Sequence, residues 1–135
     1  MNLPNDINVS ECTNAFIWKG VDDIVYIKNK PGIYIELETH KEAFETIKQV
    51  CDGQCCGLVV DLVGIHGITK ASRDYSGSKE HLDYVSGAAL LISNPVTKIL
   101  GNFFMGLNKP NFPTQLFTDI DQAEKWLKTI PKVNV

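Results

Sequence analysis

The stretch that decides the fold is Gly57-Leu58-Val59-Val60-Asp61-Leu62, which is followed by Val63-Gly64-Ile65-His66-Gly67-Ile68-Thr69-Lys70-Ala71-Ser72. The first part is a continuous apolar run ending in a carboxylate, which is typical of a strand covered on both faces. The second part contains two glycines and then Thr69, a preferred helix cap, so it predicts a loop and a helix start. In open α/β sheets, ligands and switches collect at the carboxyl ends of strands, so functional residues are expected near Asp61.

Two strands, a short extended piece and a helix are predicted before this stretch. Residues 13–19 and 24–28 are rich in β-branched and aromatic residues and are joined by a short turn, which predicts a hairpin. Residues 33–35 form a short extended piece. Apolar residues at helical spacing then predict a helix from residue 37 to residue 50 or 51, ended by Asp52-Gly53.

The second half of the chain repeats the alternation of strand and helix. The predicted elements are a helix capped by Thr69, a further turn over 78–84, strands over 88–92 and 115–118, a helix from Asn94-Pro95 to about residue 107, and a last helix capped by Asp119. The fold class is therefore α/β, with a mixed sheet in which an N-terminal hairpin is followed by alternating helices and strands. We expect one domain over residues 1–135, with its core at about 13–130.

Charge and hydropathy exclude two classes of partner. The formal net charge is -3 and the basic residues are scattered, whereas nucleic-acid binding needs clustered Lys and Arg. The first residues are polar, and no apolar run approaches the roughly 20 residues of a membrane-spanning helix. We therefore expect no nucleic acid, no membrane span and a cytoplasmic protein.

The four cysteines do not follow a metal-binding pattern. Cys51, Cys55 and Cys56 lie close together, whereas Cys12 is far away along the chain. A zinc site usually has two close pairs of ligands, and adjacent residues of an extended segment point to opposite sides. We expect free thiols in a reducing compartment, with neither metal nor cofactor.

The histidines do not form a recognisable catalytic set. His66 lies in the loop after Asp61, but no Gly-x-Ser-x-Gly elbow or Cys-His arrangement accompanies it. Asp61 is expected to accept hydrogen bonds from the amides of residues 64–67 rather than to act as an acid or base. His40 and His81 have charged neighbours and are predicted at the surface. The sequence therefore predicts a protein that is not an enzyme.

The strand Val59-Val60-Asp61-Leu62 with its loop, and the pattern Leu116-Phe117-Thr118-Asp119-x-x-x-Ala123-x-x-Trp126-Leu127, resemble a STAS domain. More narrowly, the chain resembles the SpoIIAA-like group of small bacterial proteins over about residues 13–130. The resemblance implies a non-enzymatic regulatory or interaction module, because STAS domains act as anti-sigma-factor antagonists, transporter tails, and nucleotide or partner sensors. The SpoIIAA-like group has also been likened in fold to CRAL-TRIO lipid-carrying domains.

The same resemblance suggests a switch or partner loop made of Asp61, His66, Thr69 and Ser72. In anti-sigma-factor antagonists, a serine that follows the strand-end Asp is phosphorylated, but its position falls at about Lys70-Ala71 in this chain. Thr69 and Ser72 flank this place, at a helix N-terminus where added negative charge is favoured. The alternative is that Thr69 is only a helix cap and Ser72 only a residue of the first turn.

A second candidate site is the helix predicted over 95–108. Phe104 and Met105 fall outside the stripe that should face the sheet, and with Phe103 and Phe112 they predict an apolar interface or ligand patch. The alternative is a helix that is simply well buried. Two function classes therefore remain open: a module that binds a protein partner or itself as a homodimer, and a carrier of a small apolar or lipid-like ligand.

Overall fold

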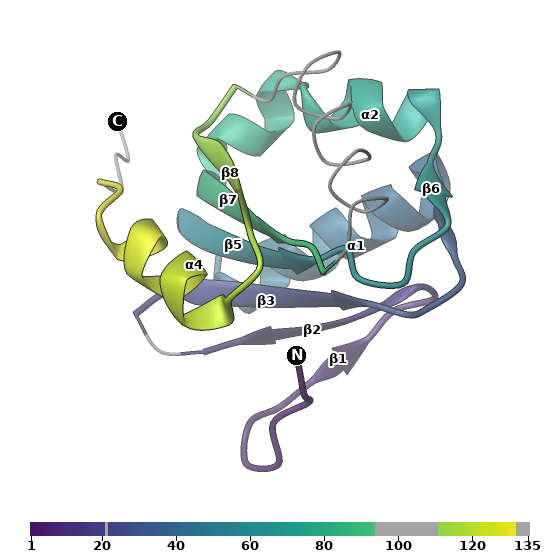
Figure 1. The fold of residues 1–135 in the computed structure, drawn as a ribbon. Helices are drawn as coiled ribbons and strands as arrows, with labels where there is room; N and C mark the ends of the chain where they lie inside the picture. Colours follow the sequence, from purple (N-terminus) through teal and green to yellow (C-terminus); the bar gives the residue numbers. More distant parts are fainter. Residues whose placement is uncertain (21, 94–110, 132–135) are drawn as a thin grey trace.

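The protein is described by a computed structural model over residues 1–20, 22–93 and 111–131. In these ranges, six strands form one sheet in the order β1-β2-β3-β5-β7-β8 (Figure 1). The strands are β1 (Ser10–Glu11), β2 (Ala15–Lys19), β3 (Ile24–Asn29), β5 (Cys56–Asp61), β7 (Val85–Leu91) and β8 (Thr114–Phe117). Two further strands, β4 (Tyr34–Ile35) and β6 (Gly67–Ile68), pair in parallel as a separate small sheet.

The main sheet is mixed, as predicted. The strands β1, β2 and β3 are antiparallel neighbours, and Ile17 pairs with Ile27 in the predicted hairpin. The strands β3, β5, β7 and β8 are parallel neighbours. Because β5 lies between β3 and β7, its carboxyl end, with Asp61, lies near the middle of that edge of the sheet.

The helices cover both faces of the sheet. The helices α1 (Leu37–Val50) and α2 (Lys70–Ser76) lie on one face and α4 (Ile120–Lys128) on the other (Figure 1). The predicted caps are confirmed, because the Thr69 side chain accepts from the Ser72 N–H and the Asp119 side chain accepts from the Asp121 N–H. The turn predicted after Ser78 is the 3₁₀ helix η1 (Lys79–Asp83).

Alternating side chains of the strands build two cores, one under each layer of helices. One core lies against α1 and includes Phe44, Ile17 and Leu58. The other core lies against α4 and includes Trp18, Val59 and Leu127. On β7, Gly87 lies close to the segment that follows α4, and a Cβ added there would lie 2.6 Å from Ile130 Cδ1.

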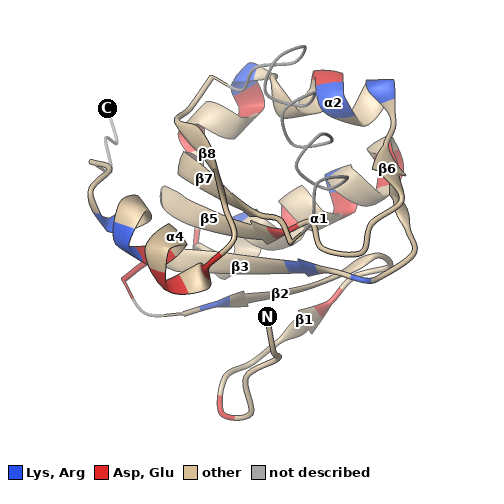
Figure 2. Cartoon of the chain, in the orientation of Figure 1, with Lys and Arg blue, Asp and Glu red and all other residues tan. Residues whose placement is uncertain are grey.

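Charged side chains lie mainly on the helices and near the ends of the strands, and β7 and β8 carry none (Figure 2). None of the helices in the described ranges has the length and apolarity that a membrane crossing needs.

The structure differs from the predicted elements at two short strands. The strands β1 and β6 were not predicted because Ser-Glu and Gly-Ile lack the run of β-branched and aromatic residues that marks the extended piece around β4. The helix predicted over 95–108 lies outside the described residues, and so do Phe103, Phe104 and Met105 of the predicted patch. Phe112 is half-buried and packs against the core on the α1 side.

Candidate functional site

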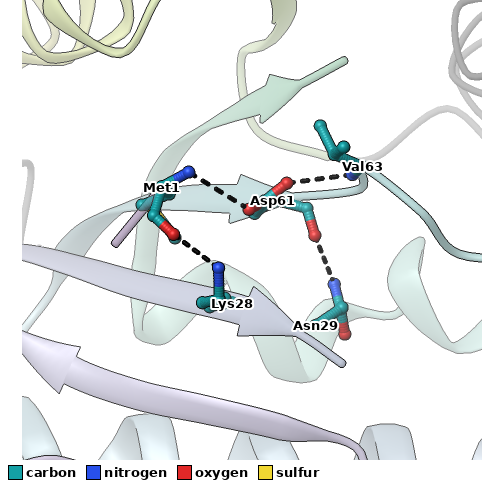
Figure 3. Close-up of polar contacts among 5 residues, drawn as sticks. All are labelled: Met1, Lys28, Asn29, Asp61 and Val63. Carbon is teal, nitrogen blue, oxygen red and sulfur yellow. Dashed lines mark hydrogen bonds and ion pairs between the residues drawn. The ribbon is translucent and has the colours of Figure 1, made fainter. Parts of the chain in front are cut away.

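Asp61 is a buried carboxylate at the end of the central strand β5. Only 5% of the residue is exposed. Its Oδ1 accepts a hydrogen bond from the Val63 N–H at 2.9 Å, and its Oδ2 lies 3.9 Å from the Met1 amino group (Figure 3). The position is as predicted, but the amide is that of Val63 rather than those of residues 64–67, because the chain turns immediately after the strand.

The backbone around Asp61 is also held by neighbouring side chains. The Asn29 amide nitrogen donates to the Asp61 carbonyl at 2.9 Å, and the Lys28 ammonium donates to the Met1 carbonyl (Figure 3). The hydrogen bond from the Val63 N–H to the buried Asp61 carboxylate is of the kind that is expensive to leave unmade, because its acceptor is charged. Asp61 therefore fixes the start of the following loop.

The loop after β5 is tied to the segment that precedes α1. The Gly32 N–H donates to the Gly64 carbonyl at 2.8 Å, and the His66 N–H donates to the Ile33 carbonyl at 2.8 Å. Gly32 has φ +77° and Gly64 has φ +83°, a region that glycine adopts without strain. With the ladder of β4 and β6, these bonds hold two loop segments side by side.

Apolar and aromatic side chains are exposed on this pair of segments. Tyr34 is 56% exposed and Val63 is 40% exposed. The ring of Tyr34 meets the exposed His66 ring edge-on, with centroids 6.0 Å apart. A Cβ added at Gly67 would lie 2.7 Å from Tyr34 Cε1, so the tyrosine ring lies directly on the β6 backbone. We call Tyr34, Val63, Gly64 and His66 the Tyr34–His66 surface.

The four residues predicted as a switch or partner loop therefore have different surroundings. No hydrogen bond joins His66 to Asp61 in the described part of the chain. The Thr69 hydroxyl caps α2, and Ser72 is fully buried, with Oγ 2.6 Å from Nδ1 of His40. Phosphorylation of Ser72 would require α2 to move away from α1.

His81 is buried and His40 is half-buried, contrary to the surface position predicted from their charged neighbours. His81 is 4% exposed and stacks on Phe44, with centroids 4.1 Å apart. His40 packs edge-on against Tyr75 at 4.8 Å and lies 5.8 Å from His81. For His40 the reason lies in helical spacing, since it precedes Phe44 by four residues and so lies on the same face of α1.

Burial makes both imidazoles poor bases. Burial, together with the nearby His81, lowers the pKa of His40 to about 4. Burial also lowers the pKa of His81. The charge of Glu80 raises this pKa, and the charge of Lys48 lowers it further. Both rings are therefore uncharged at neutral pH.

A cavity of about 120 Å³ lies between the sheet, α1 and α2. Most of the described side chains around it are apolar, and its polar groups include Ser72 and His40. The described lining residues are Cys12, Asn14, Ala15, Ile27, Asn29, Ile35, Thr39, His40, Ala43, Phe44, Ile47, Leu58, Val60, Leu62, Ile68, Ser72, Ser76, His81, Ala88 and Phe112.

All four cysteines are buried, and none of them forms a disulfide in the described part of the chain. A hydrogen bond with Cys56, together with burial, raises the pKa of the Cys51 thiol. Within residues 1–20, 22–93 and 111–131, no three His, Cys, Asp or Glu side chains are placed to share a metal ion.

Comparison with known proteins gives the family. The model of a domain of unknown function, DUF7793, matches residues 17–131. The chain belongs to this family. No curated protein matches this DUF7793 chain.

Two solved structures are similar to the DUF7793 chain. An uncharacterised protein of the DUF3478 family from Shewanella loihica PV-4, with a SpoIIAA-like fold, matches with a TM-score of 0.56 and 12% identity, over 94% of this chain and 99% of that one. A protein of unknown function from Arthrobacter sp. FB24 matches with a TM-score of 0.31 and 23% identity, over 83% and 97%. The first match confirms the SpoIIAA-like fold that the sequence resembles, and the fold alone does not assign a function.

Sequence reasoning did not single out Tyr34 or His40 for this site. Tyr34 precedes α1 by only three positions and gains its neighbours through β6, which was not predicted. The position of His40 on the apolar face of α1 was a readable signal, which its charged neighbours obscured.

Proposed function

We propose that this DUF7793 chain is a non-enzymatic protein-interaction module of SpoIIAA type, whose contact site is the Tyr34–His66 surface. The observation that carries the proposal is the exposure of Tyr34 and Val63 on two ordered loop segments at the carboxyl end of the central strand. Loops held on a rigid scaffold carry function more often than other surface elements. Clustered exposed apolar groups mark contact sites, whereas single ones do not.

The absence of charge in the two segments supports this assignment. Residues 31–35 and 62–69 contain no Lys, Arg, Asp or Glu. The strand β6 and the loop that leads into it are accordingly tan in Figure 2, without the blue or red of charged residues. The centres of protein interfaces are depleted in charged residues and enriched in tyrosine.

The hydrogen bonds that fix the loop support a contact surface whose shape exists before binding. The buried carboxylate of Asp61 fixes Val63, and backbone bonds fix Gly64 and His66. A surface already in its bound shape loses little conformational entropy on association. With Thr69 engaged as a cap and Ser72 buried, the geometry favours a contact that does not depend on phosphate.

The test removes the exposed side chains of the proposed contact site. A Tyr34→Ser, Val63→Ser double variant is compared with Leu82→Ser, which removes an equally exposed apolar side chain from η1. Sedimentation is measured on the purified chain and on extracts of its own cells. The wild type and Leu82→Ser should sediment as a complex, and the double variant should sediment as a monomer. A double variant that keeps the complex would contradict the proposal.

A second candidate function is the binding of a small apolar molecule, favoured by the cavity between α1, α2 and the sheet. Its volume of about 120 Å³ is below the roughly 300 Å³ at which pockets for drug-sized ligands begin. It approaches the volume of about 150 Å³ that holds a benzene molecule. The cavity therefore favours a small ring or short chain over a long acyl chain. The test is titration of the chain with benzene, and no saturable binding would contradict this function.

A further inference from the structure

Ser72 and His40 form a hydrogen-bonded pair among the polar residues that line the cavity. Ser72 is fully buried on α2, and its Oγ lies 2.6 Å from Nδ1 of His40 on α1. The neighbouring walls are made by apolar side chains such as Ile35, Leu62 and Ile68. A hydrogen-bonding pair in the wall of a mostly apolar cavity resembles the usual construction of small-molecule sites, in which a few polar groups orient the ligand.

The hydroxyl of Ser72 has capacity for a second hydrogen bond. The other polar groups of this residue are occupied, because its N–H donates to Thr69 and its carbonyl accepts from the Ser76 hydroxyl. A hydroxyl has one donor and two acceptor positions, of which the bond to His40 uses one. If Ser72 donates to His40, it can accept from a ligand hydroxyl. If it accepts from His40, it can donate to a ligand hydroxyl or carbonyl oxygen.

The described part of the lining selects against charge. The described residues around the cavity include no Lys, Arg, Asp or Glu. Burial keeps the imidazole of His40 uncharged at neutral pH, since its pKa is lowered to about 4. A charged ligand would therefore be buried without a counter-charge, which is strongly unfavourable.

We infer that this cavity is a binding site for a small uncharged molecule, about the size of one benzene ring, whose single hydroxyl or carbonyl group is bound by the pair Ser72 and His40. The inference rests on the second of the two functions proposed above and does not depend on the Tyr34–His66 surface. It adds the chemical class of the ligand and the residues that recognise it.

The first arm of the test measures polar recognition. The full chain is titrated with phenol and with benzene, and binding is followed by calorimetry and by the chemical shifts of residues around the cavity. One neutral hydrogen bond corresponds to about a fivefold change in affinity. Phenol should therefore bind about fivefold more tightly than benzene, and Ser72→Ala should remove this difference. Ser86→Ala, on β7 but not among the residues around this cavity, should keep it.

The second arm measures location. Ala88→Leu places a larger side chain into the cavity and should abolish the binding of both probes. Ala71→Leu makes the same change on the exposed side of α2 and should leave binding unchanged. If Ala88→Leu does not fold, the shifts of Leu62 and Ile68 in the wild type locate the probe instead.

Three results would overturn the inference, and they separate it from the function it rests on. If benzene binds as tightly as phenol, recognition by the polar pair is refuted, but an apolar-ligand site remains. Binding that survives in a folded Ala88→Leu, or that shifts only residues away from the cavity, places the ligand elsewhere. No binding of either probe overturns both the inference and the apolar-ligand function.

Discussion

Asp61 illustrates how one side chain sets the shape of a loop. Its carboxylate is buried between the Val63 amide and the Met1 amino group, so it acts as a structural anchor. A carboxylate in this position lets the chain leave the sheet in a tight turn and present Val63 to solvent. The residue that the sequence marks as functional therefore supports the exposed residues and is not itself exposed.

Replacing Asp61 by asparagine tests this anchoring role. Asparagine keeps an acceptor for the Val63 amide, but it loses the negative charge beside the Met1 amino group and buries an NH₂ group. We expect Asp61→Asn to lower the free energy of unfolding by about 1–3 kcal/mol, the range for hydrogen bonds to charged groups. Urea unfolding measures the change, with the exposed Asp6→Asn as control. An unchanged midpoint would show that Asp61 is not an anchor.

The half-buried histidine His40 predicts a dependence of stability on pH. Its pKa in the folded chain, about 4, is below the ordinary value of 6.5, so the unfolded chain binds the proton more readily between these values. Stability is therefore complete above pH 6.5 and decreases as the pH falls towards 4. The decrease is about 1.4 kcal/mol per pH unit for one histidine.

Urea unfolding between pH 7 and pH 5 measures this slope. His40→Gln removes the titrating ring, so its slope should be flatter than that of the wild type. Equal slopes in the two proteins would contradict the account of His40.

The helix α2 depends strongly on its ends because it has only seven residues. The Thr69 hydroxyl accepts from the Ser72 N–H, and this bond holds the turn that carries Ser72 towards His40. Thr69→Ala should therefore destabilise the chain by about 1 kcal/mol, as for other N-caps. Thr69→Ser keeps the acceptor and serves as the matched control in thermal unfolding. Equal losses in both variants would assign the effect to the lost methyl group instead.

The long elements of this fold were predictable because local patterns define them. The strand β5 is an unbroken apolar run, α1 has its apolar residues at helical spacing, and Asp119 caps α4. The ladder of β4 and β6 was not predictable, since it depends on two segments more than 30 positions apart. The contact of Tyr34 with His66 follows from that ladder, so the candidate surface was predicted only on the side of Asp61 and His66.

Viewed as a whole, the molecule has two cores that are packed differently. Ala88 and Ala89 are adjacent on β7, but Ala88 faces the cavity on the α1 side and Ala89 faces α4. Valine at position 88 has space to enter, so Ala88→Val should unfold at the wild-type urea midpoint or above it. Valine at position 89 overpacks a filled core and should lower stability by about 1–3 kcal/mol. Equal losses in the two variants would show that the α1 side is as tightly filled as the α4 side.

The central claim is that the Tyr34–His66 surface is where this DUF7793 chain meets a protein partner. The most direct measurement places a photo-crosslinking amino acid at position 34, with the same group at Leu82 as control, in the cells that make the protein. Mass spectrometry then identifies the adducts. The account predicts one discrete adduct from position 34 and none from position 82. This adduct contains a second protein or a second copy of the chain, and Val63→Asp should abolish it. Adducts at equal levels from both positions, or none from position 34, would contradict it.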